Sequence, residues 1–130
     1  MATWTIIIPG KLPGLNTYIN AERTHRQKAA ALKRDTQDII ISCARTQLGG
    51  VKFDKPVTMR YVWIEPDRTR DKDNIAFARK FVQDALVKCG CLKNDGWKHI
   101  FGFSDEFDVD KANPRVIVDI IEEQKGENNG

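Results

Sequence analysis

The chain has few cysteines, and their number and spacing exclude two classes of protein. Cys43, Cys89 and Cys91 form no disulfide-like framework, which favours a reducing compartment. The Cys89-Gly90-Cys91 pair, even with His99, lacks the ligand set and the spacing of roughly two to four residues that structural zinc sites use. A disulfide scaffold and a zinc site are therefore not expected.

Long apolar runs are also missing. No stretch approaches the roughly 18–20 consecutive apolar residues of a membrane-spanning helix. The opening MATWTIIIPG has no basic region before its short apolar run, so no signal peptide is predicted. We therefore expect a cytoplasmic protein without a membrane partner.

Several motifs of nucleotide binding, calcium binding and covalent catalysis are absent. The sequence has no G-x-x-x-x-G-K-[ST], so no nucleotide cofactor is predicted. A calcium loop starting at Asp71 would need glycine and glutamate where Ala76 and Val82 stand. Neither His25 nor His99 has a serine or cysteine partner in a recognisable arrangement. What remains for catalysis is a hard cation held by carboxylates.

Charge is modest in total but unevenly spread. The 130-residue chain has a formal net charge of +3. Residues 119–130 contain four acids and one base, a net −3, so the remainder carries +6. A positive body favours a polyanionic partner, although a merely solvated surface would have the same composition.

The order of expected elements predicts an α+β fold. Apolar residues at helical spacing, β-branched or alternating runs and turn residues mark the elements. They are a strand at 4–8, an ordered loop at 11–20, a helix at 22–48 with an optional break near its start, a strand at 57–63, a charged loop at 65–73, a helix at 74–88, and strands at 97–107 and 115–121. Residues 1–123 are expected to form one domain, with two main helices against a small mixed sheet, and 124–130 a disordered tail.

The segment RDKDNIAFARKFVQDAL at 70–86 places two aspartates one residue apart among bases. Asp71 and Asp73 stand beside Arg68, Arg70 and Lys72 at the entry to the expected helix. Acids next to cations suit a metal ion that meets a phosphate, and Mg²⁺ prefers carboxylate oxygens. A solvated charged loop remains the alternative.

Helical phasing adds further charged residues to this face. At about 100° per residue, Lys80 and Asp84 fall on the same side as Asp73, opposite an apolar stripe. The stripe consists of Ile75, Ala78, Val82, Leu86 and Cys89. A plain i,i+4 pair between Lys80 and Asp84, worth about 0.3–0.5 kcal/mol, would explain the same pattern.

A third metal ligand must come from elsewhere in the chain. The best candidate is Asp95 in the loop KNDGWK after the helix. Spacing alone leaves other aspartates open, namely Asp54, Asp67, Asp105, Asp108 and Asp110. One or two ions on such ligands can activate water for phosphodiester hydrolysis.

These pieces together resemble the RusA family of Holliday-junction resolvases. The matching pieces are RDKDN at 70–74, KFVQDAL at 80–86 and ND at 94–95. The opening IPGKLPGLNTYIN is similar to that family's first strand and loop. The resemblance covers about residues 5–122, nearly the whole chain.

The resemblance implies a Mg²⁺-dependent endodeoxyribonuclease, with Mn²⁺ as a substitute ion, that resolves four-way DNA junctions by paired symmetric nicks in recombination and repair. Asp71, Asp73 and Asp95 would hold the metal, and Lys80 would stabilise charge at the scissile phosphate. The implied form is a small α+β domain in a two-fold homodimer. Such proteins act in a bacterial or phage-infected host cell.

Two positions depart from the family pattern. The family's lysine lies four residues after the second aspartate, where this chain has Phe77. Lys80 lies seven residues after it, and a three-residue insertion, close to one helical turn, reconciles the two. Many members have an acid where Asn94 stands, which leaves Asp95 to carry more of the metal binding.

Bases outside the acid pair supply candidate DNA contacts. By resemblance, Arg70 would contact the DNA backbone, and further candidates for phosphate contacts are Arg68, Lys11, Arg23, Arg26 and Lys28. A solvated helix end is the plain alternative for each of the last four. Two other functions stay open: a broader nuclease that cuts flaps or replication forks, and a protein that binds junctions without cutting them.

Overall fold

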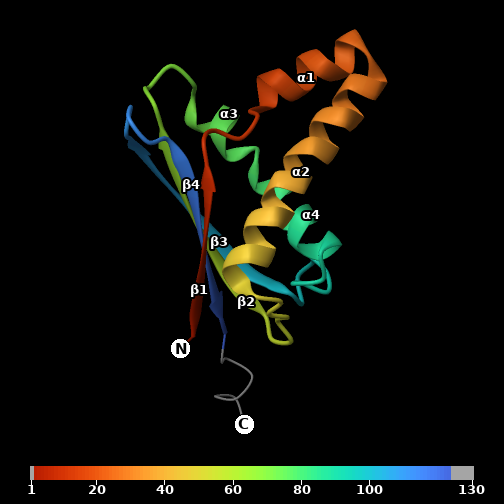
Figure 1. Cartoon of the computed structure of the whole chain (residues 1–130), viewed down its shortest axis with the longest axis vertical. Coiled ribbons are helices and arrows are strands. Elements are labelled where there is room, and N and C mark those ends of the chain that lie inside the picture. The colour runs from red at the N-terminus through yellow and green to blue at the C-terminus, as the bar shows by residue number, and fades with distance from the viewer. Residues whose placement is uncertain (1, 124–130) are drawn as a thin grey trace.

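The computed structural model describes residues 2–123 and has the α+β architecture predicted from the sequence (Figure 1). The predicted tail, 124–130, lies outside the described residues. In chain order the elements are β1 Thr3–Pro9, α1 Leu15–Thr24, α2 Arg26–Leu48, β2 Val57–Glu65, α3 Lys72–Ala76, α4 Arg79–Lys88, β3 Ile100–Val109 and β4 Arg115–Glu122.

The strands form one mixed sheet in the order β1-β4-β2-β3. β4 is antiparallel to both β1 and β2, whereas β2 and β3 are parallel. A parallel pair needs a long crossover connection, and α3 and α4 lie in that connection. The charged segment of interest therefore lies between the end of β2 and the start of α4.

The helices lie on one face of the sheet, and the core fills the space between them (Figure 1). The alternation predicted for β2 is confirmed, since Val57, Met59, Tyr61 and Trp63 are all buried. Full burial of such side chains contributes about 1.5–3 kcal/mol each. The opposing helices contribute, among others, Ile40, Ala44, Val82 and Leu86. Among residues 2–123, no helix combines the length and apolar character that crossing a membrane requires.

The backbone of the edge strand β1 is hydrogen-bonded at one residue by a side chain from α2. The carboxamide of Gln47 accepts a hydrogen bond from the Ile7 N–H at 2.7 Å and donates one to the Ile7 carbonyl at 2.8 Å. A glutamine amide thus takes the place that a neighbouring strand would occupy. The same contact ties the C-terminal turn of α2 to the sheet.

The predicted loop at 11–20 is wrong, because Leu15–Thr24 form a helix. Pro13 and Gly14 are typical turn residues and predict a loop, but Gly14 is the N-cap of α1. An amide oxygen far along the chain, Oδ1 of Asn74, accepts a hydrogen bond from the Asn16 N–H at 2.9 Å. A capping partner 58 residues away leaves no local signal in the sequence.

The break expected near the start of the long helix is confirmed at His25, which has an extended backbone between α1 and α2. His25 also caps α2, since its Nδ1 accepts a hydrogen bond from the Gln27 N–H at 3.2 Å. Helical spacing in the sequence predicts an apolar stripe on this helix through Leu32, Thr36, Ile39, Cys43 and Gln47, widened by Ile40 and Ala44, and this prediction is partly wrong. Ile39 is 54% exposed, and the buried stripe runs through Thr36, Ile40, Ala44 and neighbouring positions.

Two further boundaries differ from expectation. The helix expected at 74–88 is split, because α3 ends at Ala76 and α4 begins at Arg79. At the split, the Ala78 and Lys80 N–H groups bond to carbonyls three residues back, which tightens the turn. The strand expected from residue 97 begins at Ile100, because the three residues before it form a turn closed by the carbonyl of Gly96.

Candidate metal and phosphate site

A cleft of about 700 Å³ opens between the loop after β2, helix α3 and the C-terminal end of β3. Its lining is mostly charged and contains both predicted aspartates of the RDKDN segment. The acids of the lining are Glu65, Asp67, Asp71, Asp73 and Asp108, and the bases are Arg68, Arg70 and Lys72. Acids and bases therefore meet in one concave site.

Asp71 and Asp73 reach the cleft from the start of α3. Asp71 is the N-cap residue and Asp73 lies in the first turn. The Asp71 side chain makes no capping hydrogen bond, and both residues are exposed. Within residues 2–123, neither carboxylate has an ion-pair or hydrogen-bond partner. Their oxygens are thus available to a ligand.

The other charged groups of the cleft are more constrained. Asp67 accepts hydrogen bonds from the N–H and hydroxyl of Thr69, and these bonds lower the pKa of its carboxyl. The Lys72 ammonium lies 5.5 Å from the centre of the Phe107 ring. Arg68 is exposed at the rim. A phosphate entering the cleft would meet the Arg68 and Lys72 cations as well as the acid pair.

Arg70 anchors the acidic loop to the body of the protein. Its Nε and Nη2 donate to the two carboxylate oxygens of Glu65 at 2.9 and 2.8 Å, and its Nη1 donates to the Leu12 carbonyl at 3.0 Å. The Glu65 side chain is only 6% exposed. A bidentate pair of this kind fixes the geometry of both partners. The structure therefore uses the Arg70 guanidinium for positioning, and its expected contact with DNA stays a prediction.

Asn74 completes the same anchoring. Its side chain caps the start of α1, and Gly14 allows that contact because it has no side chain. A Cβ at position 14 would lie 2.5 Å from Oδ1 of Asn74 and 2.9 Å from Nη1 of Arg70. In the R-D-x-D-N pattern, the arginine and asparagine hold the loop to the N-terminal segment, whereas the two aspartates project into the cleft.

Gly14→Ala is accordingly expected to destabilise the protein by about 1–3 kcal/mol, because the added methyl group has no room. Urea unfolding would measure the loss. Gly102→Ala is a matched control, since a Cβ there meets no atom within 4 Å. Equal stabilities for the two variants would contradict the close packing described at Gly14.

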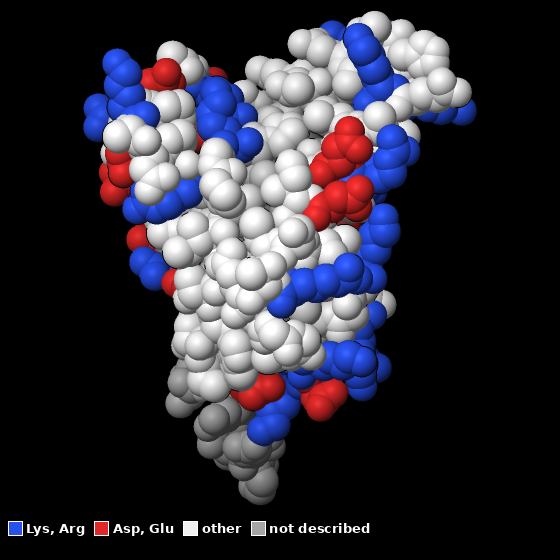
Figure 2. Space-filling model, viewed as in Figure 1, with Lys and Arg blue, Asp and Glu red and all other residues white. Residues whose placement is uncertain are grey.

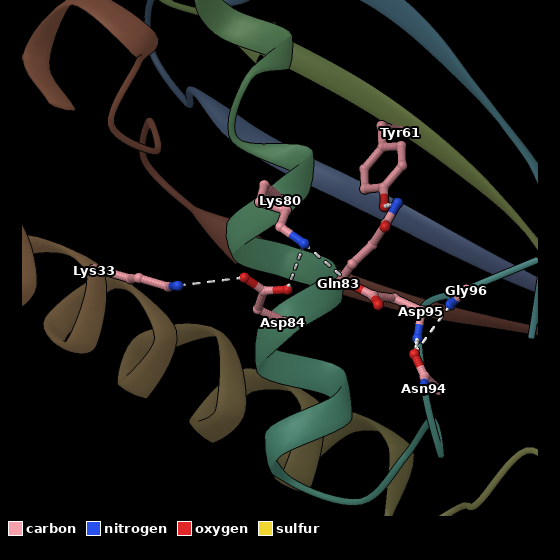
Figure 3. A network of polar contacts seen from close by, with 8 residues as sticks. All are labelled: Lys33, Tyr61, Lys80, Gln83, Asp84, Asn94, Asp95 and Gly96. Atoms are coloured by element: carbon pink, nitrogen blue, oxygen red, sulfur yellow. Dashed lines mark hydrogen bonds and ion pairs between the residues drawn. The ribbon is translucent and has the colours of Figure 1, made fainter. Parts of the chain in front are cut away.

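Lys80 and Asp95 lie in a second charged network, on α4 and the loop after it (Figure 3). Nζ of Lys80 lies 3.2 Å from Asp84 and 3.3 Å from Asp95, which confirms the expected i,i+4 pair. Nζ of Lys33 lies 3.6 Å from the other oxygen of Asp84. Hydrogen bonding to Asp84, and secondarily to Asp95, raises the pKa of Lys80, so its ammonium form is favoured.

The structure does not bring all the predicted ligands together. Asp71 and Asp73 line the cleft, whereas Asp95 and Lys80 are absent from its lining. Within residues 2–123, no group of three or more His, Cys, Asp or Glu side chains is arranged to hold a metal ion. Asp67 and Asp108, two of the aspartates that spacing left open, do line the cleft.

The break between α3 and α4 explains part of this separation. The phasing of Lys80 against Asp73 assumed one continuous helix, and that assumption is wrong. Phe77 stands at the break, and its ring packs 5.6 Å from both Tyr18 and Phe81. The position that the family pattern gives to lysine is therefore occupied by a partly buried aromatic ring.

The remaining candidate bases lie in two places. Arg23, Arg26 and Lys28 are exposed around the elbow between α1 and α2. Lys11 is exposed in the loop after β1, where its charge helps to lower the pKa of the Asp67 carboxyl in the cleft. A smaller cavity of about 330 Å³, lined partly by Tyr18 and Arg26, lies at this elbow. Figure 2 shows Lys and Arg side chains along the right-hand edge, where Figure 1 places the elbow of α1 and α2 above and α4 with its following loop below, and a mixed group at the upper left around the loop after β2.

The Cys89–Cys91 pair lies apart from both charged groups. The two sulfur atoms are 3.6 Å apart, and both side chains pack at the core. Burial, with a smaller effect of Cys89, raises the pKa of Cys91 to about 12. Both side chains therefore pack as small apolar groups.

Comparison with known proteins adds no assignment: the chain matches no protein-family model and no curated protein sequence.

Proposed function

We propose that this protein is a Mg²⁺-dependent, structure-selective endodeoxyribonuclease that resolves four-way DNA junctions as a homodimer. The observation that carries the proposal is the pair of exposed, unpartnered carboxylates, Asp71 and Asp73, beside Arg68 and Lys72 in one cleft. A site that must hold a cation against a phosphate needs both signs of charge in this arrangement. The resemblance of three sequence segments to the RusA resolvases supports the choice of substrate.

The residues of the cleft fit a hard divalent ion. Asp71 and Asp73 present carboxylate oxygens that no protein group occupies within the described chain. Bound Mg²⁺, or Mn²⁺ in its place, supplies Lewis-acid polarisation of the phosphoryl oxygen and a water of lowered pKa. Since Mg²⁺ keeps several waters and binds through few protein groups, two carboxylates are a sufficient start.

The chain's own residues then bind and orient the DNA. Arg68 and Lys72 attract the phosphate to the cleft, and Arg70 keeps the acidic loop in place through Glu65. Asp95 is the further ligand that the resemblance implies, and it pairs with Lys80 outside the cleft lining. By the same resemblance, Lys80, which also pairs with Asp84, would stabilise the negative charge that develops at the scissile phosphate.

Cleavage of a labelled synthetic four-way junction tests the proposal. With Mg²⁺, we expect symmetric nicks in opposing strands of the junction, no cut in linear duplex, and complete loss of product in EDTA. Paired nicks require two sites related by a two-fold axis, as in a homodimer. A junction that stays intact with both Mg²⁺ and Mn²⁺ would contradict the proposal.

One observation favours a second function, namely a junction-binding protein that does not cut. Asp95 is paired with Lys80 outside the cleft, so the acid set is incomplete in this conformation. Adding Mg²⁺ to a preformed protein–junction complex separates the two functions, because the binding protein yields no product. A flap or fork nuclease with the same chemistry would be recognised by a faster cut in those substrates than in the junction.

A further inference from the structure

Trp97 is the most exposed large apolar side chain of the described structure. Its side chain is 99% exposed, whereas Trp63 is buried and Trp4 is partly buried. The indole makes no hydrogen bond or ring contact with residues 2–123. The indole therefore presents its large apolar surface to solvent, and covering that surface with a flat apolar ligand would be favourable.

The loop that carries Trp97 is held in a defined shape. Oδ1 of Asn94 accepts hydrogen bonds from the N–H groups of Asp95 and Gly96, and the Gly96 carbonyl accepts two more from His99 and Ile100. The His99 carbonyl in turn accepts a bond from the N–H of Val57 in β2. The indole therefore projects from an anchored turn, and binding through it orders little additional chain.

Charge around the indole selects the kind of partner. Lys93 and Lys98 flank the turn and are both exposed. The nearest acid in sequence, Asp95, is already neutralised by Lys80 at 3.3 Å. Lys98 has no ion-pair partner among residues 2–123, and Lys93 has only a long, solvent-exposed contact of 3.9 Å with Asp54. An aromatic ring between these cations suits a nucleobase attached to a phosphate chain, since the ring stacks on the base and the lysines attract the backbone.

We propose that Trp97 is a stacking platform for an unpaired nucleobase of branched DNA. The bases of a continuous duplex cover one another, so an indole can stack only where a base face is free, as at a branch point or in a single strand. This inference rests on the proposed function, because it places DNA on the Asp95 side of the molecule. It assigns a structure-selecting role to a residue that does no chemistry.

Intrinsic fluorescence and DNA binding, both measured in EDTA, test the inference without cleavage. A labelled four-way junction and a single strand are expected to quench tryptophan emission on binding, and linear duplex to quench it less. Trp97→Phe should bind nearly as tightly but lose most of the quenching. Trp97→Ala should weaken junction binding about 5- to 150-fold. Ile39→Ala, an exposed apolar residue on α2, is the matched control and should bind normally.

The outcomes are distinguishable. Junction binding by Trp97→Ala at wild-type affinity, with no quenching in the wild type, would overturn the stacking role while leaving the nuclease proposal intact. Failure of the wild-type protein to bind any DNA would overturn both. Quenching that follows protein concentration in the absence of DNA would overturn the inference in favour of a contact between protein chains. Circular dichroism of Trp97→Ala should match the wild type, because the side chain supports no packing.

Discussion

Asp73→Asn is expected to abolish junction cleavage while junction binding persists. The amide keeps the size of the carboxylate but removes the charge that a divalent ion requires. Since a metal ion supplies several kcal/mol of transition-state stabilisation, the loss in kcat should be at least about a thousandfold. Gel assays with Mg²⁺ measure the rate, and fluorescence anisotropy in EDTA measures binding.

The matched control is Asp35→Asn, the same chemical change on the exposed face of α2. It should cleave at the wild-type rate. Thermal unfolding of Asp73→Asn should be unchanged, because the Asp73 carboxylate has no partner within the described residues. A fully active Asp73→Asn enzyme would refute the proposed metal site.

The second large effect is expected in stability. Arg70→Ala leaves the Glu65 carboxylate buried without its cation, and breaking such a pair costs about 3–5 kcal/mol. The midpoint of thermal unfolding should fall by roughly 10–20 °C. Urea unfolding monitored by circular dichroism gives the free energy directly.

Two comparisons isolate the cause of that loss. Arg68→Ala removes a neighbouring arginine that is exposed, and its unfolding should match the wild type. The double variant Arg70→Met with Glu65→Leu removes both charges and should recover much of the stability. Equal stability of Arg70→Ala and Arg68→Ala would show that the Glu65 pair contributes nothing.

The sequence predicted those features of the fold that depend on the spacing of neighbouring residues. The alternation in β2 and the apolar stripe through Ile75, Val82 and Leu86 depend only on residue spacing, and both are found in the core. The sequence showed the aspartates and bases packed into 68–73, but not that they line a cleft with Phe107 and Asp108 of β3. Helix α1 was missed because its cap comes from Asn74, which no window around residue 15 contains.

The sequence predictions that failed at the site did so for similar physical reasons. Phasing Lys80 from Asp73 required a straight helix, and the aromatic packing of Phe77 against Tyr18 accompanies a break at that point. Spacing could not place Asp95, because the turn that carries it is fixed by side-chain hydrogen bonds from Asn94. The role of Arg70 was hidden in part, since Glu65 is five residues away but Leu12 is 58 residues away.

The two hydrogen bonds between the Gln47 side chain and the Ile7 backbone also affect the tendency of this protein to aggregate at high concentration. A strand from another molecule can join the β1 border only by displacing two hydrogen bonds, each worth about 0.5–1.5 kcal/mol. In polymer terms, the glutamine acts as a chain stopper at the β1 edge of the four-stranded sheet. Growth into fibrils by edge-to-edge strand pairing needs an unpaired strand at both edges of the sheet. A stopper at one edge therefore limits growth from that edge.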